Sequence, residues 1–241
     1  MKKIIIIGAG AMGSAFAVPC VDNNNDVTIV GTHLEDSLID NINLNKQVHP
    51  ALKTQLPIEV KFERYEKLTS ILKKDIDLIV VGVSSVGIEW FVEQISKSYR
   101  ENLPIILLTK GLSIFDNELS TLSDKIKKLL KKEGYKEINI SAIKGPCLAA
   151  GLANKMRTGT VIANPNLNES HNLSKIISTE YYSTEISEDL TGVELSGAIK
   201  NIYSMLIGAG QWHNTSSALF RKSIDEMKYL ANYFKGKKET V

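Results

Sequence analysis

The 241-residue sequence contains few of the residues that build disulfide frameworks or metal sites. It has two cysteines, Cys20 and Cys147, and four histidines scattered along the chain. Two cysteines cannot form the disulfide framework of a small secreted domain, and no Cys/His spacing matches a zinc site. We therefore expect no metal, and a reduced protein of the cytoplasm.

The chain also lacks an excess of charge of one sign. Its 29 lysines and arginines nearly balance 27 aspartates and glutamates, which leaves a net charge of +2. A nucleic-acid-binding domain normally carries a strongly basic face. The balance therefore gives no reason to expect a nucleic-acid partner, although a small local anion site remains possible.

Long hydrophobic runs are missing as well. No apolar stretch approaches the ~20 residues that a membrane-spanning helix needs, so we expect no membrane span. Residues 4–18 follow two lysines and superficially resemble a secretion signal. Gly8, Gly10 and Gly13 interrupt this run, whereas a signal core favours continuous helix formers. We therefore interpret the N-terminal segment as part of the folded protein.

Short apolar segments alternate with helical patterns. Strands are predicted at residues 3–7, 26–31, 77–82, 104–109 and 138–143. Helices are predicted between them, notably at 86–98 and 118–132, where the lysines of the second are expected to form a solvated face. This alternation predicts an α/β fold with a Rossmann-type, doubly wound, mostly parallel sheet.

The glycine-rich segment Gly8-Ala9-Gly10-Ala11-Met12-Gly13 follows the first predicted strand and begins a helix. The next strand completes a βαβ unit of the ~30 residues typical of dinucleotide-binding folds. There the first glycine permits a tight turn, the second lets the backbone approach a pyrophosphate, and the third allows close helix packing. The phosphates bind at the helix N-terminus. We expect cofactor binding by Gly8, Gly10, Ala11, Met12 and Gly13.

The end of the second predicted strand bears on the choice of cofactor. A carboxylate there binds the ribose 2′-hydroxyl of NAD and repels the 2′-phosphate of NADP. This chain has Gly31, Thr32 and His33 at that place, and no carboxylate before Glu35. Thr32 and His33 are able to bind a 2′-phosphate. The sequence therefore favours NADP(H) and leaves NAD(H) open.

The sequence changes character near residue 187. Residues 189–210 form an apolar helical pattern, and a second helix is predicted from the turn at His213 and Asn214 to about residue 234. We therefore predict a dinucleotide-binding domain at 1–187 and a partial helical domain at 188–241. Because two helices cannot bury all their apolar surface, these helices are expected to form a homodimer contact.

Five segments resemble the NAD(P)-dependent glycerol-3-phosphate dehydrogenase family, and they occur in the family's order. They are the glycine loop at 8–15, the strand-end Thr-Lys-Gly segment at 108–112, the Gly-Pro turn at 145–149, the helix at 192–201 and the helix start at 214–227. The helix segment, which contains Lys200 and Asn201, is the most specific of them. Together the segments extend over the whole chain.

The resemblance implies reversible hydride transfer between NAD(P)H and dihydroxyacetone phosphate. The product, sn-glycerol 3-phosphate, is a precursor of glycerophospholipids. Carried over by position, the resemblance makes Lys200 the catalytic residue and Asn201 a substrate-binding residue. It further places Lys110 at both substrate and cofactor, Gly145 and Cys147 at the substrate, and Ala149 at the cofactor.

The chemistry of Lys200 fits this role independently. A ketone that accepts a hydride develops negative charge on oxygen, which an ammonium group stabilises and protonates. The apolar neighbours Ala198 and Ile199 would desolvate the amine and lower its pKa. The alternative interpretation is that Lys200 and Lys110 are ordinary surface lysines with no part in the chemistry. Cys147 is interpreted as a small residue lining the site, because no histidine accompanies it as a base.

The sequence departs from the family at three places. Ala150 and Gly151 stand where the family has a glutamate, and the helix link at 211–213 is short. The sequence also stops before the family's segment with a site aspartate and its Arg-Asn phosphate clamp. Two alternatives therefore stay open, a ketopantoate-type ketoacid reductase and a non-catalytic NAD(P)-binding module.

Overall fold

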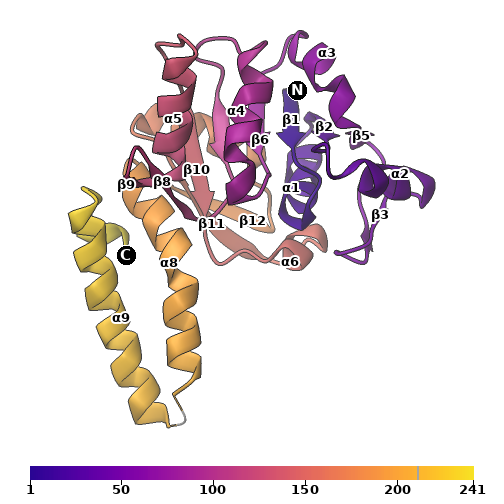
Figure 1. Ribbon diagram of the computed structural model, residues 1–241. Helices are drawn as coiled ribbons and strands as arrows, with labels where there is room; N and C mark the ends of the chain where they lie inside the picture. The colour runs from indigo at the N-terminus through magenta and orange to yellow at the C-terminus, as the bar shows by residue number, and fades with distance from the viewer. Residues whose placement is uncertain (211) are drawn as a thin grey trace.

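The computed structural model describes residues 1–210 and 212–241, so Gln211 of the predicted helix link lies outside the described residues (Figure 1). In this part of the chain the main sheet has eight strands in the order β12-β11-β10-β7-β6-β1-β2-β5. They are β1 (Lys3–Ile7), β2 (Asp26–Val30), β5 (Lys61–Glu63), β6 (Leu78–Val81), β7 (Ile105–Leu107), β10 (Ile140–Lys144), β11 (Thr158–Ala163) and β12 (Tyr182–Ser187).

The strands of the main sheet pair in parallel except between β10 and β11. Strand β1 lies between β6 and β2, with Ile4 opposite Val27 of β2 and Leu78 of β6. Parallel strands require crossover connections, and helices supply most of them. The mostly parallel, doubly wound sheet predicted from the sequence is therefore confirmed.

Helices cover both faces of the sheet (Figure 1). They are α1 (Ala11–Asp22), α2 (Asp36–Leu44), α3 (Leu68–Leu72), α4 (Ile88–Ser96), α5 (Leu122–Lys132), α6 (Ala149–Ala153) and α7 (Leu167–Ile177). Side chains alternate along each strand, so Ile4 and Ile6 pack into the core beneath α1, while Ile5 and Ile7 pack into the core beneath α4 and α5. This burial on both faces explains the unbroken isoleucine run at the N-terminus.

The predicted helix at 118–132 begins four residues later than expected. Residues Glu118–Thr121 form β9, which pairs with β8 (Leu112–Phe115) in a separate hairpin. Thr121 then caps α5, because its side chain accepts the Asp124 N–H. The expected solvated lysine face is also wrong at Lys125, which is buried and pairs with Glu89 at 2.7 Å.

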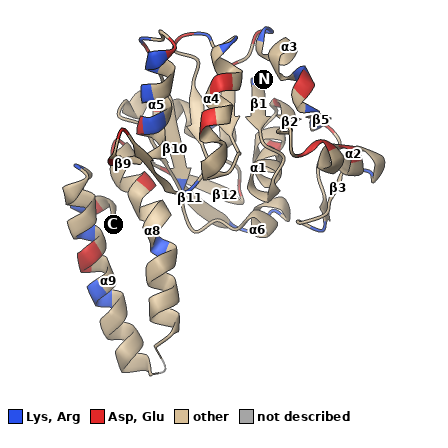
Figure 2. Cartoon of the chain, viewed as in Figure 1, with Lys and Arg blue, Asp and Glu red and all other residues tan. Residues whose placement is uncertain are grey.

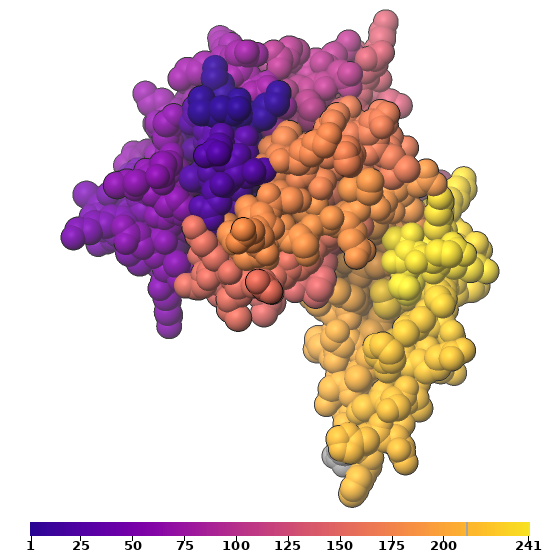
Figure 3. Space-filling view, turned by 180° about the vertical axis from the view of Figure 1, so that it is seen from behind, coloured from indigo at the N-terminus to yellow at the C-terminus, as the bar shows by residue number. Residues whose placement is uncertain are grey.

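The last two helices, α8 (Leu190–Gly208) and α9 (His213–Tyr233), form an antiparallel pair that projects from the sheet domain (Figures 1 and 3). The predicted helices at 189–210 and up to 234 are confirmed. After α9 the chain returns to the base of α8, where Asp189 accepts from Gly192 N, Lys237 N and Thr240 Oγ1. These bonds tie the C-terminal segment to the first turn of α8.

The remaining described elements are short. They are the β3 (Val48–His49) and β4 (Thr54–Gln55) ribbon, and the 3₁₀ turns η1 (Tyr65–Lys67), η2 (Ser85–Gly87) and η3 (Lys238–Thr240). Among the helices the structure describes, none is both long and apolar enough to cross a membrane.

Candidate active site

The glycine loop makes a tight turn between β1 and α1. Gly8 has φ of +109°, and a side-chain carbon there would lie 2.7 Å from the Gly82 backbone. At Gly13 such a carbon would lie 2.3 Å from the Gly8 carbonyl oxygen, so helix and strand pack too closely for any other residue. At Gly10 it would meet Glu35 Oε1 at 3.9 Å and nothing nearer among the described residues. The space above Gly10 is therefore open.

The N-terminus of α1 is suited to bind an anion. Gly10 is its N-cap, no side chain caps it, and its first turn carries no acidic residue. The unpaired N–H groups and the helix dipole therefore face the open space above the loop. This arrangement fits a dinucleotide pyrophosphate, with Ala11 and Met12 in the first turn.

Buried polar contacts hold the loop from behind. The Ala9 carbonyl accepts from Ser14 Oγ at 2.9 Å and lies 3.0 Å from His49 Nε2. The other ring nitrogen of His49, Nδ1, accepts from the N–H groups of Ala51 and Leu52. The hydrogen of the neutral ring is therefore on Nε2, which donates a hydrogen bond to the Ala9 carbonyl oxygen. No role for His49 is predicted from the sequence, because the loop carbonyl that it contacts, that of Ala9, lies 40 residues away in the chain.

Glu35 also contacts the loop, a contact that the sequence pattern does not predict. Its Oε2 accepts from Ala9 N at 3.0 Å and from Thr32 N at 2.8 Å. The carboxylate missing from the end of β2 is thus supplied by the residue that precedes α2. The nearby His33 ring packs against Tyr65 and Trp90, with centroids 6.2 and 5.4 Å away.

Lys110 follows β7 at the carboxyl edge of the sheet, where doubly wound folds place their sites. It lines a narrow crevice with Met12 of the α1 first turn and Cys147. The structure therefore brings the predicted substrate residues Lys110, Cys147 and Gly145 beside the glycine loop. Cys147 is buried, and burial raises the pKa of its thiol. Its thiol state therefore suits a lining residue better than a nucleophile.

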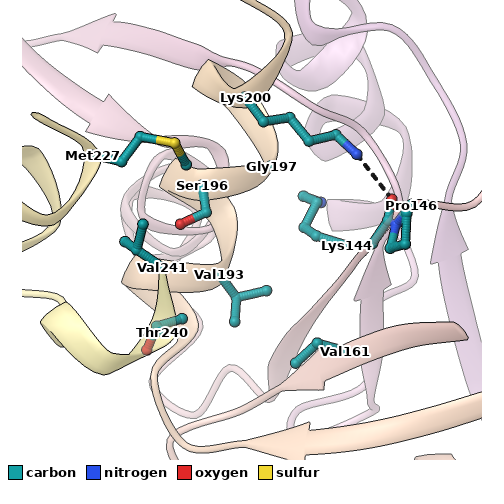
Figure 4. A pocket seen from close by; sticks show the side chains of 11 residues that line it. Lys144, Pro146, Val161, Val193, Ser196, Gly197, Lys200, Met227, Thr240 and Val241 are labelled. Atoms are coloured by element: carbon teal, nitrogen blue, oxygen red, sulfur yellow. Dashed lines mark hydrogen bonds between the residues drawn. The ribbon is translucent and has the colours of Figure 1, made fainter. Parts of the chain in front are cut away.

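Lys200 projects from α8 into a neighbouring cavity of about 270 Å³ (Figure 4). Its Nζ donates to the Gly145 carbonyl oxygen at 3.2 Å. Burial, and then the charge of Lys110, lower the pKa of Lys200. Apolar side chains from α8, α9 and β11, such as Val193, Met227 and Val161, line much of the cavity.

Lys144 at the end of β10 connects the two hollows, because Lys144 and Gly145 line both. It is buried, and its Nζ donates to the carbonyl oxygens of Leu107 and Thr109, each at 2.9 Å. Burial lowers the pKa of Lys144 to about 8, a shift that the charge of Glu194 opposes. The sequence does not single out Lys144, because this residue ends an apolar strand and matches no motif.

Glu194 of α8 supplies a buried carboxylate below the site. Its Oε1 accepts from Ser123 N at 3.1 Å, and its Oε2 accepts from the Ser123 hydroxyl. Burial raises the pKa of Glu194, while the charge of Lys144 acts in the opposite direction. The two opposite charges therefore stabilise each other in a region that excludes water.

Two of the predicted residues lie outside these hollows. Asn201 is exposed on α8 and lines neither the crevice nor the cavity. Ala149 begins α6, which packs against α1, and it too lines neither hollow. Their predicted contacts with substrate and cofactor remain predictions.

Comparisons with known proteins agree with this geometry. The family profile described as NAD-dependent glycerol-3-phosphate dehydrogenase N-terminus matches residues 3–170, and the C-terminus profile matches residues 189–241. A NADP(+)-dependent glycerol-3-phosphate dehydrogenase from Archaeoglobus fulgidus is 32% identical over 99% of this chain and 72% of its own length. A glycerol-3-phosphate dehydrogenase [NAD(P)+] from Clostridium botulinum is 29% identical over 100% of this chain and 70% of its own length.

Solved structures share the fold. A glycerol-3-phosphate dehydrogenase from Coxiella burnetii has a TM-score of 0.83 at 23% identity, over 99% of this chain and 71% of that one. A glycerol-3-phosphate dehydrogenase from Plasmodium falciparum has a TM-score of 0.85 at 24% identity, over 98% of this chain and 67% of that one. A ketopantoate reductase from Ralstonia eutropha has a lower TM-score of 0.61 at 15% identity, over 98% of this chain and 76% of that one. Two matching family profiles and a relative above 30% identity place this chain in the NAD-dependent glycerol-3-phosphate dehydrogenase family.

Proposed function

We propose that this chain catalyses the reversible NAD(P)H-dependent reduction of dihydroxyacetone phosphate to sn-glycerol 3-phosphate, a precursor of glycerophospholipids. Besides family membership, one observation carries the proposal. The amine of Lys200 lies in a cavity that shares Gly145 and Lys144 with the crevice reaching Lys110 and Met12. A proton donor and an anion-binding helix N-terminus are thus connected along one edge of the sheet.

Lys200 is proposed as the acid of the reduction and the base of the reverse reaction. A bound nicotinamide would supply the hydride. The protonated amine of Lys200 then donates its proton to the oxygen of the substrate ketone, where negative charge develops. Because burial and Lys110 lower the pKa of Lys200, the amine gives up this proton more readily than an exposed lysine. The Gly145 carbonyl holds the amine in place between turnovers.

The other predicted residues are proposed to bind the two ligands. Lys110, Gly145, Cys147 and Asn201 would bind the phosphorylated substrate, and Lys110 would also reach the cofactor. The cofactor would further contact Gly8, Gly10, Ala11, Met12, Gly13, Thr32, His33 and Ala149. The open space above Gly10 and the uncapped start of α1 support the cofactor contacts proposed for the glycine loop, Gly8 to Gly13.

We place the boundary between the cofactor domain, residues 1–187, and the helical part, residues 188–241, in the short segment between β12 and α8. We further propose that the chain acts in the cytoplasm and pairs with a second copy through α8 and α9. Exposed apolar side chains on these helices, including Met205 and Phe220, support the pairing.

The decisive experiment measures NADH and NADPH oxidation by the purified chain with dihydroxyacetone phosphate, alongside Lys200→Ala and Lys200→Met. We expect both variants to lose on the order of 10²–10⁴-fold in kcat, the size of a general acid's contribution, and to keep their affinity for cofactor. The surface variant Lys222→Ala on α9 serves as the control with unchanged kcat.

The same assay distinguishes the two alternatives. Turnover with ketopantoate in place of dihydroxyacetone phosphate would identify a ketoacid reductase. Cofactor binding without turnover of either substrate would identify a non-catalytic NAD(P)-binding module. Either result contradicts the proposed activity.

A further inference from the structure

Glu35 lies where the adenosine ribose of a dinucleotide would approach the glycine loop. One oxygen, Oε2, is held by the N–H groups of Ala9 and Thr32 and so joins the loop to the end of β2. The other oxygen, Oε1, lies 3.9 Å from the position where a side chain at Gly10 would begin. In dinucleotide-binding βαβ units the ribose lies between the second glycine and the end of the second strand.

Two backbone bonds keep this carboxylate in place. Hydrogen bonds from N–H groups to a carboxylate are charge-assisted and stronger than neutral ones. Moving Glu35 away to admit a larger group would leave both N–H groups without that partner. A ribose 2′-hydroxyl, which is a donor, is compatible with the carboxylate, whereas a dianionic 2′-phosphate would face a fixed negative charge.

The charges around Glu35 reinforce this selectivity. Residues 31–45 contain Glu35, Asp36 and Asp40 but no lysine or arginine. Figure 2 shows the acidic residues where the chain passes from β2 into α2. Arg64, which faces this segment, is paired with Asp40 at 2.9 Å through its Nε. The segment thus supplies no free guanidinium of the kind that commonly binds a 2′-phosphate.

We propose that Glu35 is a specificity-determining residue that makes this chain select NAD(H) over NADP(H). The inference rests on the proposed dinucleotide site, and it narrows the cofactor beyond the family's NAD(P). It also differs from the preference for NADP(H) that the sequence favoured, because Glu35 returns to the loop from beyond the end of β2.

The test is direct binding by titration calorimetry, which needs no turnover. The ligands are NADH, NADPH, ADP-ribose and 2′-phospho-ADP-ribose, and the proteins are the wild-type chain, Glu35→Gln and Glu66→Gln. Glu66 is an exposed glutamate of η1, so its variant removes the same charge without touching the loop. Thermal unfolding of each variant verifies that it is folded.

We expect the wild-type chain to bind each ligand without the 2′-phosphate at least ~10-fold tighter than its phosphorylated counterpart. Glu35→Gln should reduce that ratio at least ~5-fold, mainly through tighter binding of the phosphorylated ligands, because the like charge is gone. Glu66→Gln should leave the ratio unchanged.

The other possible results would refute either the role of Glu35 or the dinucleotide site itself. If NADPH binds the wild-type chain as tightly as NADH, or if Glu35→Gln leaves the ratio unchanged, the role of Glu35 is refuted while the dinucleotide site stands. An equal change in Glu66→Gln also refutes it, because a general field effect would then explain the selectivity. If none of the four ligands binds, the proposed dinucleotide site itself is contradicted.

Discussion

Lys144 is the residue of the site with the most unusual environment. Its ammonium is buried and donates to two carbonyl oxygens at the end of β7, one of them the carbonyl of Thr109, directly before Lys110. The residue after Lys144, Gly145, accepts the hydrogen bond from Lys200. Lys144 therefore contacts the backbone that positions both proposed site lysines.

Burial of this charge should make stability depend on pH. The pKa of Lys144 falls from 10.5 to about 8 in the folded chain, so above pH 8 the folded state loses a proton that the unfolded state keeps until about pH 10.5. The unfolded state then binds more protons than the folded state. The free energy of unfolding therefore rises with pH between about pH 8 and pH 10.5. Lys144→Met lacks this group.

Urea unfolding of the wild-type chain and of Lys144→Met, measured from pH 7 to pH 10.5, tests this dependence. Relative to the variant, the wild-type chain should gain on the order of 3 kcal/mol in its free energy of unfolding across this range, at about 1.4 kcal/mol per pKa unit. Two curves that stay parallel would show that Lys144 titrates normally.

Lys110 should control the proton affinity of Lys200. Both are cations at one site, and the charge of Lys110 contributes to the lowered pKa of Lys200. The reduction needs protonated Lys200, so its rate should fall as pH rises through that pKa. Lys110→Met should therefore move the alkaline limb of the kcat profile to higher pH, whereas Lys222→Met should not. A limb that stays in place in Lys110→Met contradicts this coupling.

The sequence could predict those site residues whose chemistry depends on local pattern. The glycine loop follows a buried strand directly, and Lys200 lies in a distinctive helix segment, so both are predicted from the sequence. Glu35 and Lys144 act through contacts with backbone groups 26 and 35 to 37 residues away in sequence. No local pattern reports such contacts, because they form only when the sheet assembles.

At the scale of elements, helix α8 approaches β10 very closely at Gly197. A side-chain carbon there would lie 2.8 Å from Lys144 Cδ and 3.1 Å from its Cβ. Lys200 comes three residues later and so lies on the same face of the helix, one turn away. The absence of a side chain at position 197 therefore sets the distance at which Lys200 reaches Gly145.

Gly197→Ala should push α8 away from β10. We expect a loss of about 1–3 kcal/mol in the free energy of unfolding, as for other overpacked core sites, and a lower kcat because Lys200 is displaced. Gly208, at the other end of α8, has nothing within 4 Å of its missing side chain among the described residues. Gly208→Ala should be neutral or slightly stabilising in urea unfolding. Equal effects at both positions would contradict the argument.

The sequence does not predict strands β9 and β12, and the reasons differ. Strand β12 has mostly exposed or half-buried residues at the sheet edge, so its pattern lacks an apolar run. Residues 118–121 continue a helical spacing of leucines into α5, yet they pair with β8 because the hairpin binds their backbone. The central strands are buried on both faces, and their apolar runs alone identified them.

At the scale of the whole molecule, the helical pair divides into a buried base and an exposed end. Near the sheet domain, Leu195, Ile199 and Ala231 form a small core with their neighbours. Farther out, Met205 is 77% exposed and Phe220 is 56% exposed. Figure 3 shows this end extending well beyond the rest of the surface. Such a grouping of exposed apolar side chains on one projection is typical of a surface that contacts another protein.

We therefore predict that the 241-residue chain forms a dimer through this projection. Light scattering coupled to gel filtration should give a mass near twice the 26.6 kDa of one chain at micromolar concentration. The double variant Met205→Glu, Phe220→Glu should be monomeric, because charges at an apolar contact must be desolvated without a partner. Since both side chains are exposed in the single chain, the variant should unfold at nearly the same urea concentration as the wild-type monomer. A monomeric wild-type chain over the whole concentration range would contradict this pairing, and the exposed-site variant Glu93→Gln on α4 provides a control that should remain dimeric.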